Sequence, residues 1–298
     1  MAVATSSDPH EDKGFILYQE AEKKVKSASS FLGGLFGGGS KLEEAAELYT
    51  KSANSYKLVK KYSAAGNSYQ KAAEIQEKLG VKHEVATSMV EAGNMYKKSE
   101  ASRATDCYQQ AVEIYIEMGR FSIAAKHLMT LGEVYESAEA NIEQAIATYE
   151  QAADLYKGED SVSGANKAML KVAHMCALLQ KFDKSIQLFE EVGMASMENR
   201  LLQYGAKEYF FKAVVCHFCT DADKARSAME KYIEMFPAFE GTREQRLLVK
   251  LLDAYGEEDE ELFTKEIQEY DTISKIEPWL TTHLLHIKKA MTAQEVPN

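Results

Sequence analysis

The chain has 298 residues, of which 45% are hydrophobic, and its formal net charge of −11 comprises a net of +2 over residues 1–103 and −13 over the remainder. This acidity excludes a general nucleic-acid-binding protein, which needs a cationic surface to displace counterions. The four cysteines are too few for a disulfide framework, so we expect a cytoplasmic protein kept in a reducing compartment.

The first distinctive stretch is "SSFLGGLFGGGSK", Ser29 to Lys41, in which five glycines surround four large apolar residues. The order Ser40–Lys41 is reversed relative to a phosphate-binding loop, which makes nucleotide binding a poor interpretation. The apolar side chains either tuck into the first helix pair or insert into a membrane or a hydrophobic groove. So many glycines favour a mobile, inserting loop. The four apolar residues are Phe31, Leu32, Leu35 and Phe36.

From about residue 56 onward the chain repeats with a period near 40 residues. One series of aromatic residues comprises Tyr69, Tyr108, Tyr149 and Phe189, and a second comprises Tyr56, Tyr96 and Tyr135. Small residues accompany them, as in "AGNSYQ", "AGNMYK" and "LGEVYE". Two interleaved series predict one helix pair per repeat, in which small residues allow close approach and an aromatic ring fills the gap. We therefore predict an all-α protein, a right-handed α-solenoid of helix pairs resembling tetratricopeptide (TPR) repeats.

The helix ends are marked by glycines and polar turns. Gly80 and Gly119 follow apolar helix ends, as C-capping glycines do. "YKGEDSVSGAN" reads as a polar turn around Gly158 and Gly164. The pattern of repeats therefore predicts turns at these points between the helices.

The repeat fades after about residue 194. The apolar segment 201–219 predicts a buried helix, another helix follows Pro237, and residues 261–291 predict two helices broken at Pro278. We therefore expect a solenoid over residues 1–194, including the loop at 29–41. A C-terminal helical bundle over residues 195–298 would cap it.

Motifs that could carry chemistry are weak. "CHFC" at 216–219 has no second pair of ligands at useful spacing, so we expect buried cysteines and no metal or other cofactor. No nucleophile, histidine and acid stand in a catalytic spacing, so we do not expect an enzyme. The five acids from Glu257 to Glu261 are either a solvated helix start or a docking surface for a basic partner.

Several long stretches resemble the soluble NSF attachment protein (SNAP) family, most closely its α-type. They include "FLGGLFG", "GRFSIAAKH", "AIATYEQAADLYKGE", "AKEYFFKAVVCHF" and "EYDTISKIEPWLTTHLLHIKK", and they extend over nearly the whole chain. The resemblance implies an adaptor for vesicle fusion and membrane trafficking that binds the assembled SNARE complex of syntaxin, synaptobrevin and SNAP-25-type helices. It also implies recruitment and stimulation of the hexameric AAA ATPase NSF, which unwinds that complex.

The resemblance assigns residues to three surfaces. The SNARE-binding residues it implies are Arg120, Lys126, Lys167, Leu201, Tyr204 and Lys207. The membrane-inserting loop it implies comprises Phe31, Leu32, Leu35 and Phe36, which makes the protein peripherally membrane-associated. The acids it implies for NSF binding are Asp221, Asp253, Glu257 and Glu258, the last two in a run that looks longer than in the family.

One departure and two alternatives accompany this reading. The family usually ends in an acidic tail closed by a Leu-containing dipeptide, whereas this chain ends "KKAMTAQEVPN", so we expect NSF binding with weaker stimulation. A scaffold or co-chaperone that binds peptide tails in a TPR-like groove is the alternative from another class. A γ-type SNAP paralogue with another SNARE preference is the narrower alternative.

Overall fold

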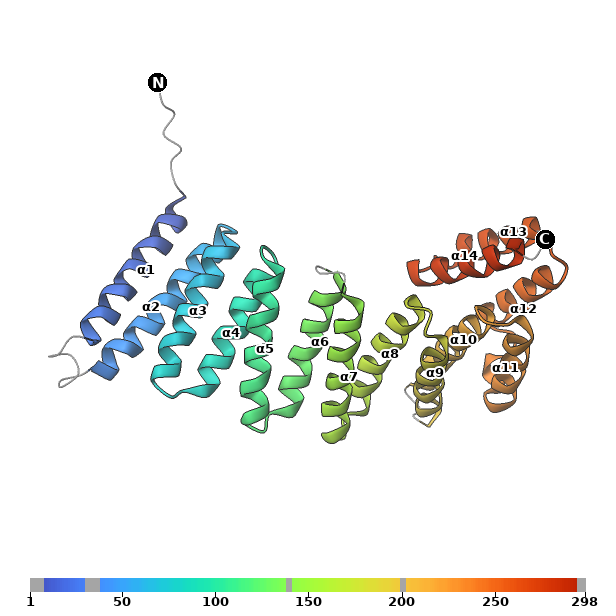
Figure 1. The fold of residues 1–298 in the computed structure, drawn as a ribbon, viewed down its shortest axis with the longest axis horizontal. Coiled ribbons are helices and arrows are strands. Elements are labelled where there is room, and N and C mark those ends of the chain that lie inside the picture. The colour runs from blue at the N-terminus through green and yellow to red at the C-terminus, as the bar shows by residue number, and fades with distance from the viewer. Residues whose placement is uncertain (1–7, 30–37, 138–140, 199–201, 294–298) are drawn as a thin grey trace, which may run out of the picture. The chain divides into compact units, whose positions relative to one another are not determined.

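The computed structural model describes residues 8–29, 38–137, 141–198 and 202–293, in which every regular element is helical (Figure 1). The helices are α1 (Pro9–Ala28), α2 (Gly38–Leu58), α3 (Tyr62–Lys78), α4 (Lys82–Tyr96), α5 (Ala101–Glu117), α6 (Phe121–Ser137), α7 (Ile142–Gly158), α8 (Val162–Leu178), α9 (Phe182–Met197), α10 (Gln203–Phe218), α11 (Ala222–Met235), the short 3-10 helix η1 (Pro237–Phe239), α12 (Arg243–Gly256), α13 (Glu260–Ile273) and α14 (Pro278–Ala293). The predicted all-α class is confirmed.

The chain divides into two compact units, residues 1–165 and 166–298. The division falls within α8, whereas the boundary predicted at residue 194 marks the point where the repeat fades. The two criteria differ, and the boundary at 194 stays a prediction. Each unit is described by itself below.

The N-terminal unit is built from antiparallel helices that pack on their sequence neighbours (Figure 1). Helices α3, α5 and α7 begin at residues 62, 101 and 142, and α4, α6 and α8 begin at 82, 121 and 162. Each repeat of about 40 residues is therefore one helix pair, as the two interleaved aromatic series predict. Gly80 and Gly119 follow the ends of α3 and α5 with φ of 75° and 67°, the left-handed conformation that glycine adopts readily.

Glycines inside the helices seat the aromatic rings of a neighbouring helix. A Cβ atom added to Gly132 in α6 would lie 2.5 Å from the ring of Tyr149 in α7. Tyr149 is fully buried, and its hydroxyl donates a 2.8 Å hydrogen bond to Glu136. Gly164 plays the same part, because an added Cβ would lie 2.6 Å from the ring of Tyr156. The prediction that Gly164 lies in a turn is therefore wrong: it lies inside α8, where an aromatic neighbour requires a small residue.

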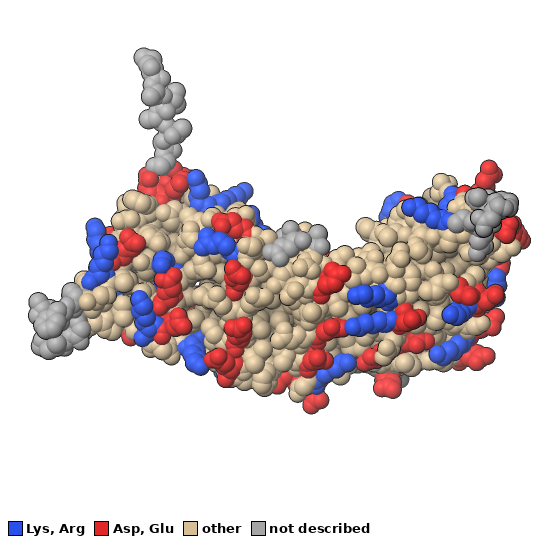
Figure 2. Space-filling model, in the orientation of Figure 1, with Lys and Arg blue, Asp and Glu red and all other residues tan. Residues whose placement is uncertain are grey.

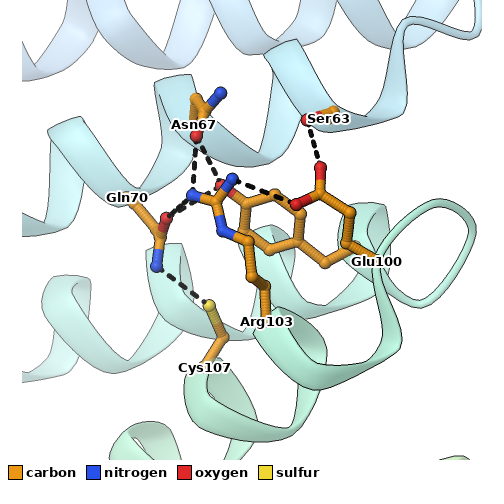
Figure 3. Close-up of polar contacts among 7 residues, drawn as sticks. Ser63, Asn67, Gln70, Glu100, Arg103 and Cys107 are labelled. Carbon is orange, nitrogen blue, oxygen red and sulfur yellow. Dashed lines mark hydrogen bonds and ion pairs between the residues drawn. The ribbon is translucent and has the colours of Figure 1, made fainter.

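A polar cluster around Arg103 joins α5 to α3 (Figure 3). The Arg103 guanidinium donates to Asn67 Oδ1 at 2.6 Å and to Gln70 Oε1 at 2.7 Å. The same group lies 4.0 Å from the centre of the Tyr96 ring, whose hydroxyl is 2.8 Å from each of those two oxygens. Glu100 accepts a hydrogen bond from Ser63 and lies 3.5 Å from Arg103. This network fixes the α5–α6 pair on the α3–α4 pair by hydrogen bonds as well as by packing.

The C-terminal unit has a core formed around α10. The buried segment predicted at 201–219 is confirmed, since α10 buries most of its length, including Phe210. The Phe210 ring stacks on the ring of Tyr232 in α11 at a centroid distance of 4.9 Å. Leu248 and Leu251 of α12 and Phe263 of α13 belong to the same hydrophobic cluster. The predicted break at Pro278 is also confirmed, because α14 begins there.

Candidate partner-binding surfaces

The N-terminal unit carries two of the cations assigned to SNARE binding. Arg120 lies immediately before α6 and Lys126 lies within that helix, and both are exposed. Ala124 and Ala125 are fully buried beside Lys126, so the helix turns the lysine away from the core. Within the described ranges, neither cation forms an ion pair. Both charges are therefore available to an acidic partner.

The C-terminal unit carries the other members of the set. Lys167 is exposed on α8 between the buried residues Ala165 and Ala168, and it too forms no ion pair with any residue that the structure describes. Tyr204, in the first turn of α10, is 79% exposed. An aromatic side chain so exposed favours a contact surface, because tyrosine gives up little conformational entropy on binding. Leu201 lies outside the described residues.

Lys207, in α10, differs from the other cations because it is already paired. Its Nζ lies 3.3 and 3.4 Å from the two carboxylate oxygens of Glu244 in α12. Both residues line a hollow of about 200 Å³, together with Tyr204. Glu244 could not be predicted from the sequence, since 37 positions separate it from Lys207 and no spacing signal marks it.

The acids assigned to NSF binding share one end of α11 and α12. Asp221 caps α11, its side chain accepting a 3.0 Å hydrogen bond from the Lys224 backbone N–H. Asp253, near the end of α12, pairs with Arg226 of α11 at 3.3 Å. Glu257 is the C-cap of α12, and Glu258 follows with φ of 57°. The structure thus brings this set together at one end of the C-terminal unit.

The acidic run 257–261 has a structural role in addition to its charge. Asp259 caps α13, accepting a 2.8 Å hydrogen bond from the Leu262 N–H, and Glu260 and Glu261 occupy the first turn. Acids there stabilise a helix through its dipole. Glu257 and Glu258 alone in this run lie outside α13 and its cap, which makes them the members freest to serve a partner.

Charges of both signs are interspersed on the face of the molecule in view in Figure 2. On that face, side chains of one sign form small groups rather than a broad field. Such a surface recognises a partner by the placement of individual charges.

Two predicted features lie outside the described residues. The loop residues Phe31, Leu32, Leu35 and Phe36 fall between the end of α1 and the start of α2, and residues 294–298 follow α14. Across the described helices, none combines the length and apolar character needed to cross a membrane.

Cys107, Cys216 and His174 behave as packing residues. Burial raises the pKa of Cys107 to about 11 and that of Cys216 to about 12, which keeps both thiols protonated at neutral pH. Burial lowers the pKa of His174 to about 4, and its ring contacts Phe189 and Trp279. No group of three or more potential metal ligands occurs among the described residues.

The fold defines a class, the TPR-like helical-repeat proteins. A solved structure with the same kind of fold is the Signal Transduction ATPase with Numerous Domains (STAND) protein with a tetratricopeptide repeat sensor from Pyrococcus horikoshii. It matches with a TM-score of 0.56 and 17% identity, covering 95% of this chain and 46% of that one.

The family follows from sequence. The model of the family "Soluble NSF attachment protein, SNAP" matches residues 12–292. The chain is 50% identical over 285 residues to the alpha-soluble NSF attachment protein of Homo sapiens, covering 96% of this chain and 97% of that one. It is 52% identical to the beta-soluble NSF attachment protein of Bos taurus, with 92% of each chain covered. It is 38% identical to the probable vesicular-fusion protein sec17 homolog of Schizosaccharomyces pombe, with 94% and 96% covered. The chain belongs to the soluble NSF attachment protein family.

Proposed function

We propose that this protein is an adaptor that binds assembled SNARE complexes and recruits and stimulates NSF, which then disassembles them with ATP. The observation that carries the proposal is the family match over residues 12–292, together with about half of the residues identical to relatives named as NSF attachment proteins. The adaptor itself performs no chemistry, and the energy for disassembly comes from the ATPase.

The SNARE-binding surface consists of Arg120, Lys126, Lys167, Leu201, Tyr204 and Lys207. The exposure of the first three cations, with no ion pair to any described residue, supports their availability to an acidic bundle. Long lysine and arginine side chains suit rod-shaped partners of varied sequence, because they reach acids at several positions. Tyr204 adds an aromatic contact where α10 begins.

NSF recruitment uses the acids where α11 begins and α12 ends. Asp221, Asp253, Glu257 and Glu258 gather there, and clustered acids steer a basic partner toward the surface. The membrane contact is made by Phe31, Leu32, Leu35 and Phe36, which follow a helix rich in lysine. Such a loop gives reversible, peripheral attachment of a cytoplasmic protein.

The test is reversal of two lysines, one in each unit. Lys126→Glu with Lys167→Glu places like charges opposite an acidic bundle, so we expect binding of the assembled SNARE complex to fall at least tenfold. Binding is measured by pull-down, and function by NSF- and ATP-dependent disassembly of the purified complex.

The matched control is Lys13→Glu with Lys289→Glu, which changes net charge equally at exposed positions on α1 and α14. It should leave binding within about twofold, because exposed charges away from an interface contribute little. Unchanged binding by the Lys126/Lys167 variant, with an intact helical spectrum, would remove this surface from the proposal. Failure of the unmodified protein to bind the assembled complex would reject the adaptor function.

A further inference from the structure

A second hollow of the C-terminal unit lies between α12 and α13 and has no role in the surfaces described above. Its volume is about 270 Å³, and its apolar lining consists of Leu247, Tyr270 and Ile273. It shares Tyr270 with the hollow beside Lys207 but none of the cations. The charged side chains that line this α12–α13 hollow are Arg243, Arg246, Lys250, Glu266 and Glu269.

The size of the α12–α13 hollow limits what it can hold. Pockets for drug-sized ligands have volumes of about 300–1,000 Å³, and this hollow lies just below that range. It has room for one large apolar side chain but not for the acyl chains of a phospholipid. Its dimensions therefore favour an anchoring side chain of a protein partner.

Ile273 is unusually exposed for a residue that lines such a hollow. It is the last residue of α13 and is 70% exposed, more than any other large aliphatic residue that the structure describes. Leu247, by contrast, is buried, and Tyr270 is half-buried. A single exposed apolar side chain is ordinary, but one that continues an apolar hollow extends the contact available to a partner.

Two of the three cations of the α12–α13 hollow have no acid of the protein beside them. Lys250 pairs with both acids of the lining. Arg246 forms no ion pair with any residue that the structure describes. Arg243, which also lacks an ion pair within the described ranges, donates a hydrogen bond to the Ser274 hydroxyl at 3.3 Å. Both arginines are exposed, and they lie three positions apart on one face of α12.

Unpaired guanidinium groups beside an apolar hollow match a particular ligand chemistry. Arginine binds carboxylates through paired hydrogen bonds, in a geometry that lysine lacks. Arg243 and Arg246 are about one helical turn apart, so two acids a few residues apart in a partner can each reach one of them. A bulky apolar residue near those acids would fill the hollow.

We propose that the α12–α13 hollow binds a short acidic segment of a partner protein. The segment inserts one large apolar side chain against Leu247, Tyr270 and Ile273 and places its acids on Arg243 and Arg246. No ion pair inside the protein has to break for this segment to bind, so the full charge of both arginines is available to it. The site goes beyond the adaptor function, since none of its residues belongs to the sets assigned to SNARE complexes, membrane or NSF.

The first test uses designed peptides and fluorescence anisotropy. The probe is a labelled peptide of about twelve residues, with one central phenylalanine among glutamates and serines. Matched peptides replace the phenylalanine by serine, or the glutamates by lysines. We expect saturable binding of the acidic peptide, binding at least about fivefold weaker for the serine peptide and none for the lysine peptide, because ring burial and charge both contribute.

Substitutions in the full-length protein then locate the binding site. Arg246→Glu should weaken binding of the acidic peptide about tenfold and allow the lysine peptide to bind, since the charge of the site is reversed. Lys289→Glu, at an exposed position on α14, is the charge-matched control. Ile273→Ser should weaken binding about three- to tenfold, whereas Leu285→Ser, at a residue 53% exposed on α14, should leave it unchanged.

Several results would overturn the inference. They are absence of saturable binding of the acidic peptide up to about 1 mM, equal binding of the acidic and serine peptides, and equal effects of Arg246→Glu and its control. If Arg246→Glu reduces co-sedimentation with phosphatidylserine vesicles but not peptide binding, the hollow serves a lipid instead. Parallel loss of the assembled SNARE complex by Arg246→Glu would place this arginine on the SNARE-binding surface. Retained binding of that complex, with loss of the peptide, supports a separate site.

Discussion

At the scale of single residues, the helix pairs depend on contacts between a glycine and an aromatic ring. Gly66 faces Tyr96, Gly132 faces Tyr149 and Gly193 faces Phe210, each across a helix–helix contact. The ring occupies the space that a β-carbon would take, which brings the two helix backbones close together. The accompanying tyrosine hydroxyls find polar partners, as Tyr108 does with Asn94 at 2.7 Å. Each repeat is thus specified by a few small residues as much as by its large ones.

Gly132→Ala should destabilise the protein. The added Cβ would lie 2.5–2.8 Å from atoms of the Tyr149 ring, which is fully buried and held by Glu136. Overpacking of this kind costs about 1–3 kcal/mol, against a gain of about 1 kcal/mol in helix propensity. We expect a net loss of up to about 2 kcal/mol in the free energy of unfolding, measured by urea denaturation followed by circular dichroism.

Gly158→Ala is the control for this substitution. Gly158 is the last residue of α7, and no atom lies within 4 Å of an added Cβ. Alanine there should be neutral or stabilising by up to about 1 kcal/mol. A Gly132→Ala protein as stable as the Gly158→Ala protein would contradict the role assigned to the glycine–ring contact.

At the scale of elements, the helices could be predicted from the sequence and the contacts between distant residues could not. Aromatic residues at a period near 40 predict one helix pair per repeat, and α3, α5 and α7 do begin about 40 residues apart, because the same packing recurs in each pair. Gly164 was misassigned because a glycine that seats a ring and a glycine that ends a helix look alike in sequence. The Lys207–Glu244 pair could not be found, since it depends on how α10 and α12 pack.

The membrane contact expected of the segment between α1 and α2 can be tested by substitution. Phe31→Ser with Phe36→Ser removes two large apolar side chains, each worth about 2 kcal/mol when buried in a lipid surface. We expect disassembly of SNARE complexes anchored in liposomes to slow at least tenfold, while disassembly of soluble complexes changes less than twofold. Both rates are measured with purified NSF and ATP.

Phe15→Ser tests whether any exposed phenylalanine near the N-terminus could provide the contact with the lipid surface. Phe15 is 58% exposed on α1, within a regular helix rather than in the glycine-rich segment. Its replacement should leave the liposome rate nearly unchanged. Equal loss for anchored and soluble complexes in the Phe31/Phe36 variant would point to a folding role for the segment instead.

At the scale of the whole molecule, we expect the two partners to bind separate groups of side chains of opposite charge. The separation is local, because residues 104–298, which carry a net charge of −13, contain both groups. The exposed cations Arg120, Lys126 and Lys167 are assigned to an acidic bundle, and the acids at the α11–α12 end are assigned to a basic partner. Loss of one partner should therefore leave binding of the other intact, as an adaptor requires.

Asp221→Asn with Asp253→Asn tests this separation. Asparagine caps a helix about as well as aspartate, so the first change removes charge from the start of α11 without removing its cap. The second removes an exposed pair with Arg226 that contributes little to stability. Two interfacial charges at up to about 1 kcal/mol each correspond to a fall of roughly 5- to 30-fold in affinity for NSF.

Glu113→Gln with Asp154→Asn, exposed acids of the N-terminal unit, is the matched control. Co-sedimentation with the assembled SNARE complex, with and without NSF, measures both interactions in one experiment. The variant should retain the complex and lose NSF, whereas parallel loss of both would mean that the two surfaces are not independent.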